Sequence, residues 1–406
     1  MSKLLEQINE SRITKRLGDL VLINQSSITN GFSYKEIEYI DTSAVTKNHF
    51  ENPKLLNINE APSRAKRLLK DGDTILSTVR PNLCHYGFIK DPKPNTVAST
   101  GFVVLTPKNI NPFYLYSYLT QDSITDTLSS IAEATTTTFP AFRPEVLSEM
   151  EIEIPDLPIQ NKIAEILSAY DVKIENNNKI TKNLEATAQT IFNEWFINLR
   201  FPGYEKVKMV DSEVGEIPAG WSVGKIKDFI RVESGFPFSS SVFNDQGKYK
   251  LVTIRNVQDG SFVTDCDNLI DELPSKLPEH CLLRSGDILL SLTGNVGRIC
   301  LVNGENYVLN QRVSVLVPVD ERDRAYTYFL FRRNDFQNLL ISISKGTAQL
   351  NLSPVETKEL EAIIPNDITL EKYSEIATPI YKKIVEINSE NVKLKETRDQ
   401  LLAKLI

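Results

Sequence analysis

The sequence contains few of the residues from which metal sites, disulfides and redox centres are built. Its 406 residues include four cysteines and three histidines. No two cysteines form a CxxC pair. This spacing excludes the common zinc and thioredoxin-like motifs and fits the reduced thiols of a cytoplasmic protein. The histidines, His49, His85 and His280, lie far apart without a paired carboxylate. We therefore expect no metal site in this chain.

Long apolar runs and a signal peptide are also missing. No segment approaches the roughly 20 apolar residues that a membrane-spanning helix needs. The N-terminal sequence MSKLLEQINESRITKR has no apolar core of the kind found in secretion signals. The composition, 41% hydrophobic and 24% charged, is that of a globular protein, and 406 residues suit two domains. We expect a cytoplasmic protein.

An excess of positive charge is missing too. The formal net charge is −7 and the isoelectric point is near 5.3, whereas a protein that holds duplex DNA unaided ordinarily has a basic surface. Two local basic clusters occur, and a solvated surface is the simplest interpretation of either: Arg64, Lys66, Arg67 and Lys70, and Arg322, Arg324, Arg332 and Arg333. If the chain binds DNA, partner subunits are expected to supply much of the contact with phosphate.

Catalytic motifs are absent or incomplete. The segment GNVGR (294–298) has neither the spacing nor the Lys-Ser/Thr ending of a phosphate-binding loop. The segment NPFY (111–114) resembles the Asn-Pro-Pro-Tyr box with which adenine methyltransferases hold a flipped base, but it lacks the second proline, and no glycine-rich cofactor site precedes it. We therefore expect no catalytic or cofactor-binding residue in this chain.

The chain does contain a long uninterrupted heptad pattern. Between Pro158 and Asn198 the following residues recur in alternating steps of four and three: Ile163, Leu167, Tyr170, Ile174, Asn177, Thr181, Leu184, Ala188, Ile191 and Trp195. This seam predicts one helix, about 60 Å long at roughly 1.5 Å per residue, that is buried along one side against another helix. A helix of this length in mid-chain predicts a spacer between two domains.

The chain is also internally duplicated. Residues 68–77 (LLKDGDTILS) match 282–291 (LLRSGDILLS), and residues 144–155 (PEVLSEMEIEIP) match 354–365 (PVETKELEAIIP). A second long helix is expected after the second copy. Its seam, at the same offset, is Tyr373, Ala377, Ile380, Ile384, Ile387, Asn391, Leu394, Arg398, Leu401 and Leu405. The order is therefore domain, helix, domain, helix.

The globular parts are predicted to be α+β domains. Short β-rich segments such as DTILSTV and ASTGFVVL alternate with turn residues, and one helical stretch covers 112–131. This mixture favours a curved sheet over a doubly wound fold. The predicted parts are a first domain (1–157), a central spacer helix (158–199), a linker (200–220), a second domain (221–368) and a C-terminal spacer helix (369–406).

In order and in duplication, these segments resemble the specificity subunit of a type I restriction–modification system over nearly the whole chain. The segments that match are the Gly-Asp turn followed by ILS or LLS in each half, STGF (99–102), TGNVG (293–297), IPDLPIQNKIAEIL (154–167), IFNEWF (191–196) and GEIPAGW (215–221).

This resemblance implies a non-catalytic DNA-binding subunit of a restriction–modification system. Each half would be a target-recognition domain that reads one half of a bipartite double-stranded DNA target. The helices would set the spacing and dock two methylation subunits, and restriction/translocase subunits would complete the complex. S-adenosylmethionine, ATP and Mg would then belong to the partners. Two alternatives stay open: a solitary DNA methyltransferase or nuclease with degenerate motifs, and a coiled-coil interaction protein with no role at DNA.

Side chains able to form hydrogen bonds with base edges gather where the predicted strands end. In the first domain these candidates are Arg80, Asn82, Ser99 and Thr100, and in the second they are Thr293, Asn295, Arg298, Asn310, Gln311, Arg312, Lys345, Thr347, Gln349 and Asn351. Ordinary turn chemistry explains each residue equally well by itself. As sets at equivalent places in a duplicated domain, they predict loops that contact DNA.

The two long helices are predicted to pair as an antiparallel coiled coil. Two domain–helix repeats present both domains to one duplex most simply about a two-fold axis, and an axis perpendicular to the helices makes them antiparallel. The predicted register places Asn177 opposite Asn391 and Trp195 opposite Tyr373. A buried polar pair is a known means of fixing register. Alternatively, these polar residues mark a solvent-exposed stretch in which the two helices separate.

Overall fold

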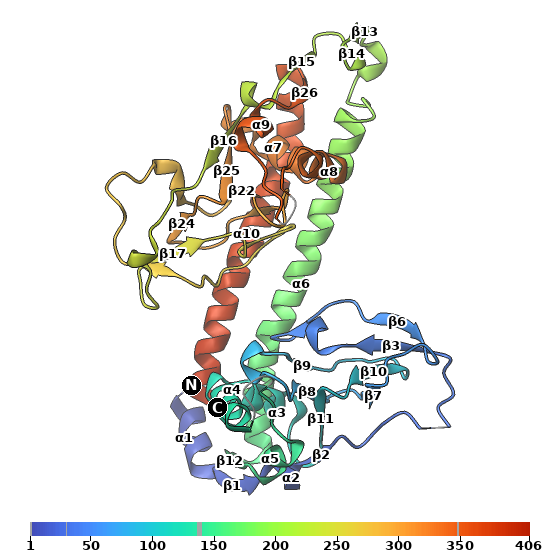
Figure 1. The fold of residues 1–406 in the computed structure, drawn as a ribbon, viewed down its shortest axis with the longest axis vertical. Coiled ribbons are helices and arrows are strands. Elements are labelled where there is room, and N and C mark those ends of the chain that lie inside the picture. The colour runs from blue at the N-terminus through green and yellow to red at the C-terminus, as the bar shows by residue number, and fades with distance from the viewer. Residues whose placement is uncertain (1, 30, 136–139, 347–348) are drawn as a thin grey trace. The chain divides into compact units, whose positions relative to one another are not determined.

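The structure, a computed structural model, describes residues 2–29, 31–135, 140–346 and 349–406. It falls into two compact units, residues 1–172 with 396–406 and residues 173–395, which are described separately. Each unit holds one globular domain and parts of both long helices, α6 (Leu157–Phe196) and α10 (Asp367–Leu405). In Figure 1 these two helices are drawn in green and in red.

The long helices form where the heptad pattern predicts them, and they run antiparallel. The helix α6 starts behind Asp156, whose Oδ1 accepts the N–H of Ile159 at 3.1 Å, and α10 starts behind Asn366, which accepts the N–H of Thr369 at 2.9 Å. Both side chains satisfy a backbone donor that the first helical turn leaves free. The α+β fold with an antiparallel helix pair is therefore confirmed.

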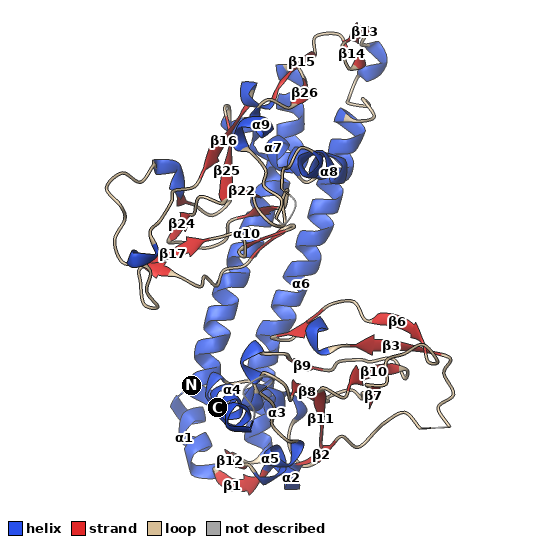
Figure 2. Cartoon of the chain, in the orientation of Figure 1, coloured by secondary structure: helices blue, strands red, loops and turns tan. Residues whose placement is uncertain are grey.

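The first domain is built from short strands and helices that cover residues 2 to 154 (Figure 2). Its strands are β1 (Ile13–Arg16), β2 (Val21–Ile23), β3 (Glu36–Ile40), β4 (Val45–Thr46), β5 (His49–Phe50), β6 (Lys54–Asn57), β7 (Ala65–Leu68), β8 (Thr74–Ser77), β9 (Tyr86–Phe88), β10 (Thr96–Ser99), β11 (Phe102–Pro107) and β12 (Glu151–Ile154). Its helices are α1 (Ser2–Ser11), α2 (Leu17–Leu20), α3 (Pro112–Leu119), α4 (Asp122–Thr135) and α5 (Pro144–Glu149).

Two four-stranded sheets make up the body of the first domain. Their strand orders are β6-β3-β10-β7 and β2-β11-β8-β9. The pair β3–β10 is parallel, and β1 pairs antiparallel with β12, which joins the start of the domain to its end. Helix α3 packs its buried Tyr114 into a core that also contains Ile163 and Leu167 of α6 and Leu405 of α10. The long helices are thus part of the domain core in this unit.

The second domain repeats this construction. Its strands are β15 (Ser222–Lys225), β16 (Ile230–Ser234), β17 (Tyr249–Val252), β18 (Val257–Gln258), β19 (Ser261–Phe262), β20 (Leu269–Ile270), β21 (Leu282–Leu283), β22 (Ile288–Ser291), β23 (Ile299–Leu301), β24 (Tyr307–Leu309), β25 (Val313–Pro318) and β26 (Glu361–Ile364). Its helices are α7 (Arg324–Phe331), α8 (Asn334–Ser342) and α9 (Pro354–Lys358).

The sheets of the second domain have the orders β16-β25-β22-β23 and β20-β17-β24-β21. As in the first domain, one pair is parallel, β17–β24, and the first strand pairs with the last, β15–β26. Aromatic side chains dominate the core, where Phe196 of α6 lies 4.9 Å, between ring centroids, from both Tyr326 of α7 and Tyr373 of α10.

The repeated Gly-Asp pair makes the same turn in both domains. Gly72 and Gly286 have φ angles of +81° and +92°, which residues with a side chain rarely adopt. The aspartate that follows accepts a backbone N–H at 2.7 Å, from Lys70 in the first domain and from Arg284 in the second. The turn leads directly into β8 and β22, whose residues are buried throughout.

The predicted linker, residues 200–220, includes regular structure. They contain a hairpin, β13 (Met209–Ser212) with β14 (Gly215–Pro218). Phe201 stacks on Trp221 at 5.2 Å, and Ile217 is buried in the same core. The periodicity of the sequence could not predict this structure. A short segment that contributes only single side chains to a core has no repeating hydrophobic pattern. Among the described residues, no helix has the length and apolar character needed to cross a membrane.

Candidate nucleic-acid interface

In the first domain three loops meet beyond the ends of β8 and β11. Thr78 donates its backbone N–H to Gly101 at 2.9 Å and accepts the N–H of Phe142 at 3.0 Å. Arg80 donates its N–H to Pro140 at 2.8 Å. The loops that follow β8, precede β11 and precede α5 are therefore joined through their backbones. A joined set of loops can present side chains in fixed relative positions.

The candidate residues of the first domain fall into two groups. Arg80, Asn82 and Thr100 are exposed on these loops. Arg80 has a left-handed backbone, with φ 49° and ψ 64°, a conformation that costs a non-glycine residue about 1–2 kcal/mol. Ser99 is only 1% exposed, and its Oγ accepts the N–H of Gly101 at 3.2 Å. The prediction that Ser99 contacts bases does not fit this burial.

The second domain brings the equivalent loops together. Leu292, just after β22, donates its N–H to Arg312 at 3.1 Å and accepts the N–H of Leu352 at 2.7 Å. Gly294 donates to Leu350 at 2.9 Å. The candidates after β22, before β25 and between α8 and α9 therefore converge, as their counterparts do in the first domain.

Some candidates in this cluster also join the loops to one another, and of these Thr293 is buried whereas Lys345 and Asn351 are exposed. Thr293 is 5% exposed and donates its hydroxyl to Asn351 Oδ1 at 3.0 Å. Asn351 also exchanges backbone hydrogen bonds with Lys345, at 2.8 and 2.9 Å, and Lys345 forms an ion pair with Glu356. The burial of Thr293 does not fit the prediction that it contacts bases. Thr347 lies outside the described residues.

The remaining candidates of the second domain reach the surface. Asn295, Gln311, Arg312 and Gln349 are exposed, Arg298 and Asn310 are half-buried, and Asn310 pairs with Phe236 through the backbone. Arg298 donates to Gln258. With the Asn295 amide turned so that its oxygen faces Arg298, that oxygen lies 3.2 Å from both Nη1 and Nη2.

The charge on these loops is modest, which agrees with the acidic composition. Among the described residues Arg312 forms no salt bridge, so its guanidinium is available to a phosphate or a base. The basic cluster around residues 322–333 is not a freely solvated surface, because each arginine pairs with a carboxylate: Arg322 with Asp367, Arg324 with Asp287, Arg332 with Asp259, and Arg333 with Asp335.

Each Gly-Asp turn, which precedes β8 or β22 whereas the loop clusters follow these strands, contains a carboxyl with little exposure: Asp73 is 1% exposed and the Asp287 side chain is 21% exposed. Burial raises the pKa of Asp73 and of Asp287, and the backbone hydrogen bond that each accepts opposes this shift. Their oxygens cap turns, so their contacts are structural. Among the described residues no group of His, Cys, Asp or Glu side chains could hold a metal ion.

The helix pair contains a polar layer within the second unit. Asn177 donates its amide to Asn391 Oδ1 at 2.8 Å and to Glu390 at 2.8 Å. Asn391 in turn donates to Asn178 at 2.9 Å. Asn177 and Asn391 are 2% and 6% exposed. Further along the pair, the rings of Trp195 and Tyr373 lie 5.8 Å apart.

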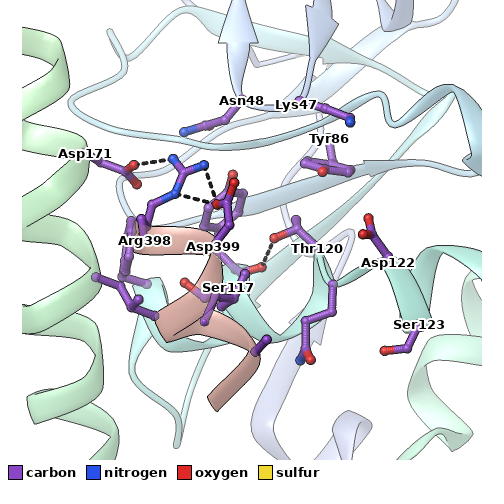
Figure 3. A pocket seen from close by; sticks show the side chains of 16 residues that line it. Lys47, Asn48, Tyr86, Ser117, Thr120, Asp122, Ser123, Asp171, Arg398 and Asp399 are labelled. Atoms are coloured by element: carbon purple, nitrogen blue, oxygen red, sulfur yellow. Dashed lines mark hydrogen bonds and ion pairs between the residues drawn. The ribbon is translucent and has the colours of Figure 1, made fainter. Parts of the chain in front are cut away.

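In the first unit the paired helices are joined by charge. Arg398 of α10 occupies a seam position and donates to Asp171 of α6 at 2.6 Å. It also donates to its neighbour Asp399 at 2.8 Å. Figure 3 shows these three side chains in a cavity of about 460 Å³ that is also lined by Lys47 and Thr120. Spacing alone indicated that Arg398 faces α6, but it could not indicate the carboxylate partner.

Comparison with protein families identifies the repeated domain. The type I restriction modification DNA specificity domain matches twice, at residues 11–186 and 218–395. The chain belongs to this family. The two matches coincide with the two sequence repeats, and the resemblance recognised from the segment order is confirmed.

Relatives in the specificity family align with most of the chain. The type I restriction enzyme HindI specificity subunit of Haemophilus influenzae is 25% identical, over 92% of this chain and 94% of its own length. The MjaIX specificity subunit of Methanocaldococcus jannaschii is 28% identical, over 82% of this chain and 76% of its own length. The crystal structure of the type I restriction–modification S subunit from M. genitalium has a TM-score of 0.53 at 14% identity, over 97% of this chain and 96% of that one, and so shares its fold.

Proposed function

We propose that this chain is the non-catalytic DNA-recognition subunit of a type I restriction–modification complex. One observation carries the proposal: each of two matching specificity domains brings three polar loops together at one place. A cluster of arginine, asparagine and glutamine side chains on exposed loops has the donors and acceptors needed to distinguish base edges. Two such clusters in one chain suit a target that consists of two half-sites.

The residues proposed to face DNA are the candidates that the structure leaves accessible. In the first domain these are Arg80, Asn82 and Thr100, and in the second Asn295, Arg298, Gln311, Arg312, Lys345, Gln349 and Asn351. Asn310 is half-buried and is proposed to contact DNA at the edge of this set. Thr293 and Asn351 hold the loops together, and Ser99 supports a turn.

The partners follow from the charge and from the family. A chain of net charge −7 with few unpaired cations on its loops needs other subunits to neutralise phosphates. We propose two methylation subunits docked along the helices, joined by restriction/translocase subunits, with S-adenosylmethionine, ATP and Mg bound by those partners. A solitary methyltransferase or nuclease is not favoured, because the family match is to a specificity domain.

Mapping adenine methylation across the host genome, with and without this gene, tests the proposal. We expect one bipartite sequence to lose methylation when the gene is deleted and to regain it when the gene is restored. Methyl transfer by the purified chain without partners would contradict a non-catalytic role. Methylation that remains unchanged after deletion would contradict the recognition role.

A further inference from the structure

One arginine in the second unit connects three elements that the sequence does not relate. Arg332 follows helix α7, and its guanidinium forms an ion pair with Asp259 in the turn of the β18–β19 hairpin. Its Nη2 lies 3.9 Å from Glu185 of α6, which also accepts the hydroxyl of Tyr328. The Arg332 side chain is 18% exposed and that of Glu185 21%. The hairpin is therefore tied to the long helix by a half-buried charged group.

The same hairpin contacts the loop proposed to read bases. Gln258, next to Asp259, accepts a hydrogen bond from Arg298. Gly260 donates its N–H to Ile299 at 2.7 Å, at the end of that loop. Gln337 of α8 also donates to Asp259, at 2.8 Å. A continuous set of contacts thus runs from α6 through the hairpin to Arg298.

The turn is shaped around the arginine. Gly260 has φ +71°, and a Cβ at this position would lie 2.7 Å from Nη2 of Arg332 and 3.2 Å from Cζ. Any side chain at position 260 would therefore require the guanidinium of Arg332 to move from this position. The glycine is needed both for the left-handed backbone and for the close approach of Arg332.

The first unit has the same hairpin without this arginine. Its β4–β5 turn consists of Lys47 and Asn48, and Asn48 has φ 62°. Thr120, which follows α3 as Arg332 follows α7, turns its hydroxyl to its own helix at Tyr116, 2.9 Å away. Among the described residues Lys47 forms no ion pair. In the first unit Lys47, Asn48 and Thr120 line the cavity that also holds Arg398 (Figure 3).

We propose that Arg332 is a positioning residue that holds the Asn295–Arg298 loop in place through the β18–β19 hairpin. The inference rests on the proposed function, because it concerns how one recognition loop is fixed. It applies to the second domain and not to the first, where the hairpin turn carries the opposite charge and the residue that follows α3 is Thr120. Removal of the Arg332 side chain should therefore reduce sequence selectivity at one half-site only.

The test uses the full chain assembled with its methylation subunits. Methylation rates are measured on the genuine target and on duplexes with single-base changes in either half-site, after a domain exchange has shown which half-site the second domain reads. Arg332→Met should lower discrimination at that half-site by about tenfold, within the range expected for one bidentate base contact. Discrimination at the other half-site should not change, and Arg332→Lys should restore part of the loss.

Two further variants separate positioning from folding. Arg333→Met is the matched control, because the neighbouring Arg333 pairs only locally with Asp335 among the described residues, and it should leave both half-sites unchanged. Asp259→Asn removes a half-exposed carboxylate and should reproduce the selective loss even if Arg332→Met folds poorly.

The close packing of Gly260 against Arg332 can also be tested without DNA, by thermal unfolding. Gly260→Asn should lower the Tm in the wild-type background but much less in an Arg332→Thr background, because the combination of Asn and Thr is the one that the first unit contains. Additive effects on Tm would overturn the packing argument. Loss of discrimination at both half-sites, or at neither, would overturn the positioning role. If the wild-type complex preferred no sequence at all, the proposed function itself would fail, and this inference with it.

Discussion

At the scale of single residues, the two domains place different side chains before the equivalent helices α3 and α7. Asn111 caps α3 by accepting the N–H of Tyr114 at 2.9 Å. Asp323 stands at the same place before α7 but makes no side-chain cap. It is 7% exposed, and its Oδ1 has no hydrogen-bond partner among the described residues. Burial raises the pKa of Asp323 to about 6, although Arg322 opposes the shift.

The substitution Asp323→Asn should therefore stabilise the protein in a pH-dependent way. Because the folded pKa lies above the ordinary value of 3.8, the wild-type protein loses stability as pH rises from about 4 to about 6 and remains penalised above that. The variant should gain about 2 kcal/mol in free energy of unfolding at pH 8, and the gain should shrink towards pH 4. Urea unfolding at several pH values measures this.

The reverse change in the first domain is the control. Asn111 is half-buried and caps α3, so Asn111→Asp keeps the cap and should not lower stability as pH rises. An equal gain for Asp323→Asn at every pH would show that ionisation of this carboxyl is not the cause.

At the scale of elements, the helix pair depends on a polar layer inside an otherwise apolar seam. Ile174, Asn177 and Ala188 on α6 are buried, as are Ile384, Ile387 and Asn391 on α10. Displacing the pair by one heptad in either direction would place one asparagine against an apolar side chain, Asn391 against Leu184 or Asn177 against Ile384, at a cost of about 1–3 kcal/mol for the unsatisfied amide. We propose that this layer selects the register.

Replacing both asparagines by leucine tests this role. Asn177→Leu with Asn391→Leu should raise the Tm, since apolar pairs commonly stabilise coiled coils more than polar pairs do, while the spacing between half-sites becomes less uniform. Asn183→Leu, at an exposed position of α6, is the control and should leave the spacing uniform. A double variant that kept one sharp spacing would show that the amides do not select the register.

If the helices act as a spacer, their length should determine the gap in the target. Seven residues added to each helix keep the seam in phase and lengthen each helix by about 10 Å. At roughly 3.4 Å per base pair, the gap between half-sites should widen by about three base pairs. Methylation mapping shows the new target. An insertion of four residues, which breaks the seam, should instead abolish methylation, and an unchanged gap after seven would reject the spacer.

The sequence was most informative about elements and least informative about individual side chains. A seam such as Ile163 to Trp195 predicts a helix because its period is set by helical geometry, and the repeat predicts a second helix. Arg332 and Asp259 could not be paired in advance, because contacts between residues far apart depend on the packing of the whole domain. The burial of Ser99 and Thr293 could not be predicted for the same reason, although Ser99 lies directly before the exposed Thr100.

At the scale of the whole molecule, the duplication predicts that the two recognition domains can be exchanged independently. Replacing residues 1–157 with the equivalent segment of another specificity subunit should change one half-site of the methylated target and leave the other intact. Each domain closes on itself through a strand pair, β1–β12 or β15–β26, which supports such an exchange. Simultaneous change of both half-sites would rule out independent recognition.

The composition of the first unit also has a consequence for how the protein is made. Residues 396–406 belong to this unit, although residues 173–395 separate them from the rest of it. Leu405 is fully buried in its core, and Arg12 donates to the backbone of Ile406 at 3.1 Å. Because residues 396–406 are synthesised last, part of the core of the first domain should stay exposed until the second domain has left the ribosome. Removing residues 396–406 should lower the Tm of the first unit and leave the second unit intact, and hydrogen exchange measured on each unit would show this. Pauses in translation near the end of the message should increase the dependence of folding on chaperones.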